Sequence, residues 1–175
     1  MNLKKIIILI VPFLIVPFML SVITTAEENL TDISPLSTDV IESVMHPETQ
    51  HLAADVLRIC KEENISAEFI VSVMRWERRP DLHNWFGWTN SNGKLIKFES
   101  DIACLEYVIP IIKKNYLSPD GKYFEGYSIS AVAKHYNTLP EWETIIKAEY
   151  DRIIKETRKN KSEDIPNIIN TIKVR

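Results

Sequence analysis

The sequence predicts a predominantly helical α+β domain in which one small β-hairpin follows a helix that ends in a glutamate. Apolar residues recur at helical spacing in several segments of the chain. Only four glycines occur among 175 residues, which disfavours an all-β chain with many tight turns. One strong turn signal, Asn-Ser-Asn-Gly at 90–93, lies between two short β-compatible runs at 86–89 and 94–98.

Residues 1–26 are typical of an export segment. Lys4 and Lys5 precede an uncharged apolar run at 6–23, and small residues at 24–26 offer a cleavage site. The run is longer than the roughly 7–15 residues of a usual signal-peptide core and matches the roughly 17–25 that span a bilayer. A cleaved signal peptide and a single-helix membrane anchor therefore both stay open. Either way, the lysines hold the N-terminus in the cytoplasm, and we expect the rest of the chain outside the membrane.

Overall composition narrows the function classes. The chain has 21 basic and 24 acidic residues with no block of like charge, which argues against a nucleic-acid-binding patch. Its four histidines and two cysteines show no CxxC, HxxxH or HExxH spacing, so we expect neither a metal nor another cofactor. Outside the cytoplasm Cys60 and Cys104 are free to pair, but their apolar helical surroundings favour two buried thiols.

The folded part is expected to begin after a polar stretch at 27–48, which we interpret as a linker. Pro47 is placed to open a first helix that runs to about Glu63, and Asn64 ends it. The stripe predicted to be buried on this helix comprises Leu52, Val56, Ile59 and Cys60.

A second helix is predicted at 67–77, with Ser66 as its N-cap. Its core-facing side is expected to carry Phe69, Ile70, Val73 and Trp76. Glu68 and Ser72 are expected to point elsewhere. Glu77 lies four residues after Val73 and so faces the core side.

Glu77 is the most informative residue of the chain. A carboxylate on the core-facing side loses water, which favours its protonated form. A general acid must carry a proton that it can donate, so a carboxyl group that stays protonated near neutral pH suits this role. The alternative is a glutamate at the helix end that turns to solvent or pairs with Arg78 or Arg79.

The chain after Pro80 is expected to leave the helix, pass through the aromatic loop 81–88 and form the hairpin. Ser100 and Ser128 are predicted N-caps of a third and a fourth helix. The third helix carries an apolar stripe, and Pro110 within it predicts a kink or an early break. That stripe consists of Ile102, Leu105, Ile109 and Ile112.

The last helix is predicted to open at 139–141, and a charged C-terminal tail follows at 159–175. Its candidate core residues are Trp142, Ile145, Ile146, Ile153 and Ile154.

Residues 75–88 read Arg-Trp-Glu-Arg-Arg-Pro-Asp-Leu-His-Asn-Trp-Phe-Gly-Trp. A helix that ends in Glu, then a spacer and Asn-x-Phe-Gly before a hairpin, resembles the bacterial peptidoglycan glucosaminidases (mannosyl-glycoprotein endo-beta-N-acetylglucosaminidase-like domains). This family belongs to the lysozyme-like superfamily, together with lytic transglycosylases. Further similar motifs are Phe98-Glu99-Ser100 and the Tyr136-Asn137 pair, followed by Trp142. The resemblance covers about 49–158 and implies a lysozyme-like domain there.

The resemblance implies roles for single residues. Glu77 matches the catalytic general acid, and Tyr136 matches a tyrosine close to that acid and to the N-acetyl group of the substrate. Asn137 stands beside Tyr136, and Asn84 and Phe86 match the turn that shapes the cleft.

Other candidate site residues follow from the chemistry of glycan cleavage. Trp88, at the base of the predicted hairpin, is our candidate for stacking on a sugar ring. Glycosidases commonly use a second carboxylate, for which Glu99 is our candidate ahead of Asp81 and Glu125.

The leading hypothesis is an extracytoplasmic N-acetylglucosaminidase that cleaves peptidoglycan glycan strands and acts as a monomer. A lytic transglycosylase, which needs only the one acid, is the first alternative. Arg78 and Arg79 depart from the small residue usual after the catalytic Glu, and nearby cations favour the ionised form of an acid. A non-catalytic wall-binding module with the same fold is therefore an alternative of another class.

Overall fold

The computed structural model describes residues 28–33 and 35–172, with side chains described as far as residue 159. The predicted export segment, residues 1–26, lies outside the described residues. No helix in the described ranges is long and apolar enough to cross a membrane.

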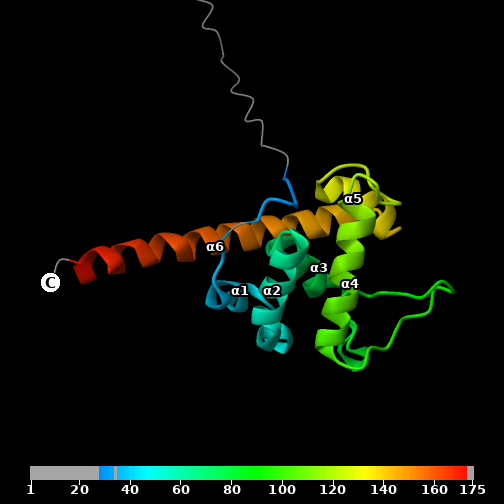
Figure 1. The fold of residues 1–175 in the computed structure, drawn as a ribbon, viewed down its shortest axis with the longest axis horizontal. Helices are drawn as coiled ribbons and strands as arrows, with labels where there is room; N and C mark the ends of the chain where they lie inside the picture. The colour runs from blue at the N-terminus through cyan, green and yellow to red at the C-terminus, as the bar shows by residue number, and fades with distance from the viewer. Residues whose placement is uncertain (1–27, 34, 173–175) are drawn as a thin grey trace, which may run out of the picture.

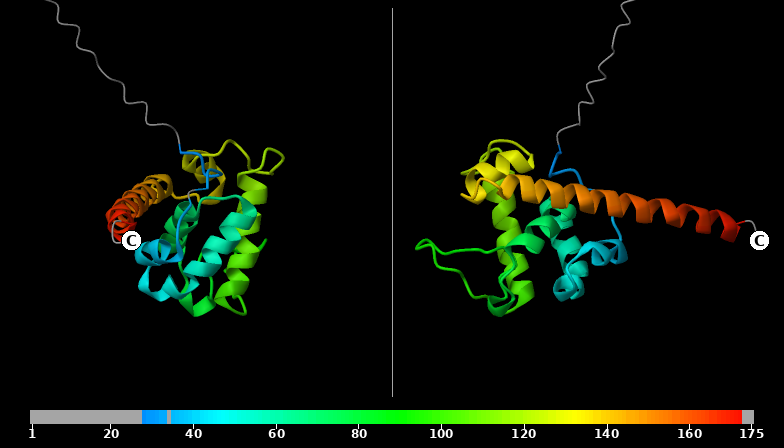
Figure 2. Two further views of the ribbon diagram at one scale, coloured as in Figure 1. Left: turned by 60° about the vertical axis from the view of Figure 1, so that its left-hand side comes forward. Right: turned by 180° about the vertical axis from the view of Figure 1, so that it is seen from behind.

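The described chain is predominantly helical, as predicted. Figure 1 shows the long helix α6 running along one side of the domain, with the shorter helices packed against its first half. In chain order the elements are α1 (Thr38–Val44), the 3-10 helix η1 (Pro47–Leu52), α2 (Ala53–Glu63), α3 (Ala67–Glu77), the 3-10 helix η2 (Pro80–Leu82), α4 (Asp101–Tyr116), α5 (Ile129–Tyr136) and α6 (Trp142–Ile172). Figure 2 shows from two further sides that α6 extends well past its packed neighbours.

The three predicted serine caps are confirmed. The hydroxyl oxygen of Ser66 accepts from the Phe69 N–H at 3.2 Å, and the Ser100 hydroxyl accepts from Ala103 at 3.1 Å. The Ser128 hydroxyl accepts from an N–H three residues on, at 3.2 Å. Each cap satisfies an amide of the first helical turn that has no partner within the helix.

Helix α3 lies at the centre of the domain and packs against both α2 and α6. Residues 67–74 are all buried, so the prediction of a one-sided helix is wrong here. Glu68 is buried although it was expected to point elsewhere, and the Ser66 hydroxyl donates to its carboxylate at 2.8 Å. Trp76, expected in the core, is 48% exposed, since the continuous burial of α3 ends at Met74.

The predicted β-hairpin is wrong, because the described chain contains no β-strand. Residues 86–98 instead form a two-armed loop that projects from the domain (Figure 1). The turn at 90–93 does form, and one isolated antiparallel bridge joins Thr89 to Leu95. Residues 89–95 are all exposed, and a lone pair of strands without a covering layer is at best marginally stable.

Helix α4 runs from Asp101 to Tyr116 without a break, so the early break expected at Pro110 does not occur. Proline removes the hydrogen bond to the carbonyl four residues earlier, which here belongs to the exposed residue Glu106. Water can satisfy that carbonyl. Ile102, predicted in the buried stripe of this helix, is 42% exposed in its first turn.

The polar stretch predicted as a linker is partly folded. Residues 38–44 form α1, and Leu30 and Ile41 are fully buried. The backbone of Leu30 is held from both sides, since its N–H donates to Tyr127 at 2.8 Å and its carbonyl accepts from Ser66 at 2.7 Å. A few well-spaced apolar residues are thus enough to fold an otherwise polar segment.

At the other end of the chain, α6 continues to Ile172, through most of the segment predicted as a charged tail. The predicted buried thiols are confirmed, since Cys60 and Cys104 are both buried and free. Burial raises the pKa of the Cys104 thiol to about 12, which makes it unreactive at neutral pH.

Candidate active site

Glu77 is the last residue of α3, and it is partly buried where α3, α5 and α6 meet. One carboxyl oxygen, Oε1, accepts two hydrogen bonds. The indole Nε1 of Trp142 donates to it at 2.7 Å and the side-chain amide of Asn137 donates at 2.9 Å. Trp142 begins α6 and Asn137 is the C-cap of α5, so three helices fix the position of this carboxyl group.

The other carboxyl oxygen, Oε2, lies against Gly87. A methyl group on Gly87 would stand 2.7 Å from Oε2, closer than a carbon and an oxygen can approach without a clash. The backbone of Gly87 also has a φ of +59°, which favours glycine. Only glycine therefore lets the loop approach the acid this closely.

A cavity of about 390 Å³ opens beside Glu77, and we call it the Glu77 cavity. Glu77 is the one acidic residue that lines it. The other lining residues are Phe86, Gly87, Trp88, Thr89, Asn115, Tyr116, Tyr123, His135, Tyr136 and Asn137. An acid beside several aromatic rings in a hollow of this size suits a sugar, whose C–H faces stack on such rings.

Tyr136 belongs to an aromatic cluster behind the acid. Its ring stacks on Trp142 with centroids 5.0 Å apart, and it also contacts Trp88 and Tyr116. Its hydroxyl donates to the Phe86 carbonyl at 3.3 Å rather than to Glu77. Burial, reinforced by the charge of Glu77, raises the pKa of Tyr136 well above its usual value, so its hydroxyl stays protonated.

Asn84, a candidate for shaping the cleft, is completely buried and does not line the cavity. Its amide nitrogen donates to the carbonyls of Trp88 and Ile96, at 2.9 and 2.8 Å, and its oxygen accepts from the Trp88 N–H at 2.8 Å. Asn84 thus ties together the two arms of the projecting loop. It positions Trp88, which lines the cavity as expected.

The candidate second carboxylate is not at the site. Glu99 is exposed and does not line the cavity, and Asp81 is exposed as well. Glu125 approaches the cavity only through His135, whose Nε2 lies 2.7 Å from the Glu125 carboxylate. Hydrogen bonds from Lys134 and His135 lower the pKa of Glu125 and keep it ionised.

Neither Arg78 nor Arg79 forms an ion pair with Glu77 within the described ranges, although the sequence raised that alternative. The guanidinium of Arg79 donates to the backbone carbonyls of Arg78 and Glu77, at 2.8 and 3.4 Å.

Sequence reasoning anticipated Trp142 as a core residue but missed its hydrogen bond to Glu77. A signal was present, because a buried tryptophan usually finds a partner for its indole N–H. The contact with Asn137 was missed too, and these partners lie 65 and 60 residues from Glu77 along the chain.

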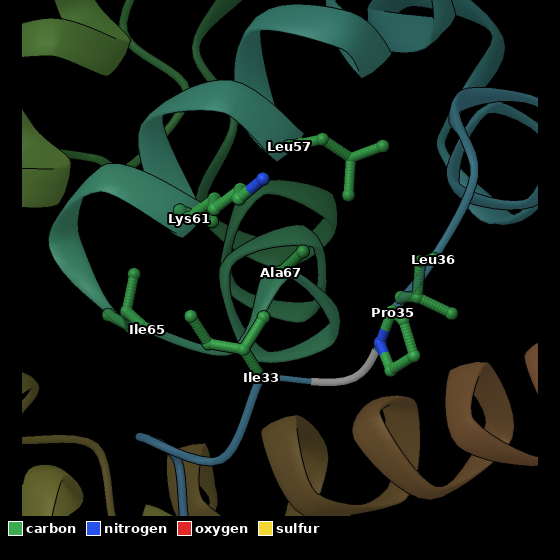
Figure 3. A pocket seen from close by; sticks show the side chains of 8 residues that line it. Ile33, Pro35, Leu36, Leu57, Lys61, Ile65 and Ala67 are labelled. Carbon is green, nitrogen blue, oxygen red and sulfur yellow. The ribbon is translucent and has the colours of Figure 1, made fainter.

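A second cavity of nearly equal size, drawn in Figure 3, shares no lining residue with the Glu77 cavity. It measures about 380 Å³ and lies between the N-terminal segment, α2 and the start of α3, and we call it the apolar cavity. Its lining residues are Ile33, Pro35, Leu36, Leu57, Cys60, Lys61, Ile65 and Ala67. No acid and no aromatic ring is among them.

The described residues contain no group of three or more His, Cys, Asp or Glu side chains that could hold a metal ion. No protein-family model matches the chain, and no curated protein sequence matches it either.

Proposed function

We propose that this protein cleaves the glycan strands of peptidoglycan outside the cytoplasmic membrane, with Glu77 as the general acid. One observation carries the proposal: a partly buried carboxyl group has one oxygen held by two donors, while the group lines an aromatic cavity of sugar size. The resemblance of residues 75–88 and of Tyr136-Asn137 to the glucosaminidases supports the same chemistry. It also supports a lysozyme-like domain over about 49–158, which we propose acts as a monomer.

The hydrogen bonds around Glu77 favour one site for the catalytic proton. Trp142 and Asn137 both donate N–H groups to Oε1, so this oxygen must use its lone pairs. In the neutral acid, Oε1 then serves as the carbonyl oxygen and Oε2 carries the proton. When the glycosidic bond breaks, Oε2 gives that proton to the leaving oxygen.

The developing positive charge on the sugar needs a nucleophile, and among the residues that the structure describes Glu77 is the only acid that lines the cavity. We therefore propose that the substrate supplies it. In an N-acetylglucosaminidase, the acetamido oxygen of the substrate attacks the anomeric carbon, and water then opens the resulting ring. Tyr136 also lines the cavity. Because its hydroxyl proton goes to the Phe86 carbonyl, that hydroxyl can orient the acetamido group only by accepting from the acetamido N–H.

The same observation favours a second candidate, a lytic transglycosylase. There the 6-hydroxyl of the sugar attacks its own anomeric carbon, and no water is consumed. Mass spectrometry of the products distinguishes the two, since only the transglycosylase leaves 1,6-anhydro ends. We expect ordinary reducing ends if the acetamido route operates.

Loss of turbidity of purified cell walls tests the role of Glu77. We expect wild type to clear the walls and Glu77→Gln to lose at least about a thousandfold in rate, since the amide cannot donate the acidic proton. Glu99→Gln makes the same chemical change at an exposed residue outside the cavity and should clear at the wild-type rate. Equal, nonzero clearing by wild type and Glu77→Gln would remove Glu77 from the mechanism.

The wall-binding module makes a different prediction in the same assay. If neither wild type nor Glu77→Gln clears the walls, yet both sediment with them, the domain binds peptidoglycan without cleaving it. The catalytic proposal would then be abandoned.

A further inference from the structure

A groove lies on the other side of the C-terminal end of α3 from the Glu77 cavity, and we call it the Trp76 groove. It measures about 490 Å³. It is lined by His46, Arg75, Trp76, Arg78, Ile145, Ala148 and Glu149. Trp76 is 48% exposed, so about half of its side chain is accessible to a ligand in the groove.

The charges of this groove are not all neutralised. The Arg75 guanidinium already has partners within the protein, because it forms an ion pair with Glu149 and donates to the Val44 carbonyl at 3.1 Å. Burial alone would raise the pKa of Glu149, but its bonds to Arg152 and Arg75 outweigh burial and lower that pKa. The Arg78 guanidinium has no hydrogen bond or ion pair with any residue that the structure describes. One free cation therefore stands in the groove together with an exposed indole ring.

The groove and the Glu77 cavity are close neighbours. Trp76 and Arg78 flank Glu77 in the sequence, but they line the groove whereas Glu77 lines the cavity. Along α6, Trp142 holds Glu77, and Ile145, one turn later, lines the groove. Trp142 and Ile145 are three residues apart, about 4.5 Å along the helix axis, so the groove begins within one helical turn of the residue that holds Glu77.

We propose that the Trp76 groove binds the acidic peptide attached to the glycan strand, with a peptide carboxylate on Arg78 and an apolar peptide side chain against Trp76. This proposal rests on the proposed function, because it assumes a peptidoglycan strand at Glu77. The sugar rings of the strand are uncharged once the peptide is attached, so the carboxylates come from the peptide. Arg78 can take such a carboxylate through two parallel N–H bonds.

Distance permits this arrangement. An extended peptide spans about 3.3–3.6 Å per residue, so four residues reach about 13 Å, more than two helical turns. A strand in the Glu77 cavity can therefore lay its peptide across the first turn of α6 and into the groove.

Co-sedimentation tests the proposal without any need for catalysis. In the background of Glu77→Gln, we would compare Arg78→Gln and Trp76→Ala on intact peptidoglycan and on glycan strands freed of peptide by an amidase. Arg158→Gln is the matched control, since Arg158 is exposed on α6 outside the groove. Circular dichroism would verify that each variant is folded.

We expect Arg78→Gln and Trp76→Ala to weaken binding to intact peptidoglycan about tenfold and to leave binding to peptide-free strands unchanged. Arg158→Gln should change neither. The proposal would be overturned if Arg78→Gln and Trp76→Ala weakened binding equally to intact peptidoglycan and to peptide-free strands. It would also be overturned if they weakened binding to neither. A loss that disappears once anionic wall polymers are stripped from peptide-bearing walls would assign the groove to such a polymer and also overturn it. Failure of Glu77 in the turbidity assay would leave these binding results valid.

Discussion

The Glu77 cavity and the apolar cavity differ in chemistry far more than in size. Their volumes are about 390 and 380 Å³. The first combines a carboxyl group, aromatic rings and polar side chains from three helices and two loops. The second is lined by aliphatic side chains and a thiol, with Lys61 as its one charged residue (Figure 3). Volume therefore does not identify the site.

The two cavities also differ in what their neighbours do. At the Glu77 cavity, residues distant in sequence converge on one oxygen atom, which costs chain entropy and leaves polar groups at a half-open surface. Around the apolar cavity, the N-terminal segment only covers the apolar surface of α2 and α3. The polar groups held in place at the Glu77 cavity indicate a functional site. The apolar surface covered at the apolar cavity indicates a contribution to stability.

After the loss of Glu77 itself, the largest expected effect comes from filling the space at Gly87. In Gly87→Ala the new methyl group would meet Oε2 of Glu77 at 2.7 Å and displace the acid, so we expect wall clearing to fall at least about a hundredfold. Gly93→Ala is the matched control, because Gly93 also has a positive φ of +73° but has no atom within 4 Å of the added carbon. Similar activity losses in the two variants would attribute the effect to backbone strain.

The next effect tests the hydrogen bond to Oε1. Trp142→Phe keeps an aromatic ring but removes the indole donor, and we expect a 10- to 100-fold loss in the clearing rate, on the order of 1–3 kcal/mol. Trp85→Phe shortens another buried tryptophan, one that does not line the cavity, and should leave the rate per folded molecule unchanged. A wild-type rate in Trp142→Phe would mean that the donor is not needed.

At the apolar cavity we expect stability to change and activity to remain. Ile65 is fully buried and lines this cavity. Ile65→Ala should lower the free energy of unfolding by about 2–5 kcal/mol, measured by urea denaturation. The clearing rate per folded molecule should not change. A loss of activity without a loss of stability would give the apolar cavity a role in function.

The smallest effect lies away from both cavities, at Asp101 in the first turn of α4. Burial alone would raise the pKa of Asp101, but hydrogen bonds with His83, at 2.7 Å, and His51, at 3.2 Å, outweigh burial and lower it. A depressed pKa in the folded state stabilises the fold above the unfolded value of about 3.9, and this gain is lost as pH falls through the folded value.

Asp101→Asn should therefore lower the free energy of unfolding slightly at pH 6–7, by no more than about 1 kcal/mol as measured by urea denaturation. The difference from wild type should shrink near pH 3. Clearing of walls at neutral pH should not change. A difference in stability that grows toward low pH would contradict the assigned ion pairs.

Features that depend on neighbouring residues in the sequence were predicted better than features that depend on tertiary packing. Ser66, Ser100 and Ser128 cap helices as predicted, because a cap depends on the next three residues alone. The hairpin and the position of Trp76 were wrong, because strand formation and burial depend on which elements cover a segment. Periodicity cannot supply that information.

The candidate site was predictable to a similar degree. Glu77, Phe86, Tyr136 and Asn137, which the resemblance pointed to, all line one cavity. Trp88, chosen for its place at the base of the predicted hairpin, lines the same cavity. The hydrogen bond from Trp142 to Glu77 and the close approach of Gly87 depend on tertiary packing. Glu99 was chosen for its place after the loop, but its side chain is exposed and remote from the cavity lining.

The central claim is that Glu77 donates the proton that breaks a glycan strand, and counting new strand ends tests it most directly. Purified peptidoglycan would be incubated with wild type and with Glu77→Gln, and the reducing and anhydro ends would be quantified by mass spectrometry. We expect new ends with wild type and fewer than about a thousandth as many with Glu77→Gln. New ends formed at comparable rates by the two proteins, or no new ends with wild type, would contradict the account.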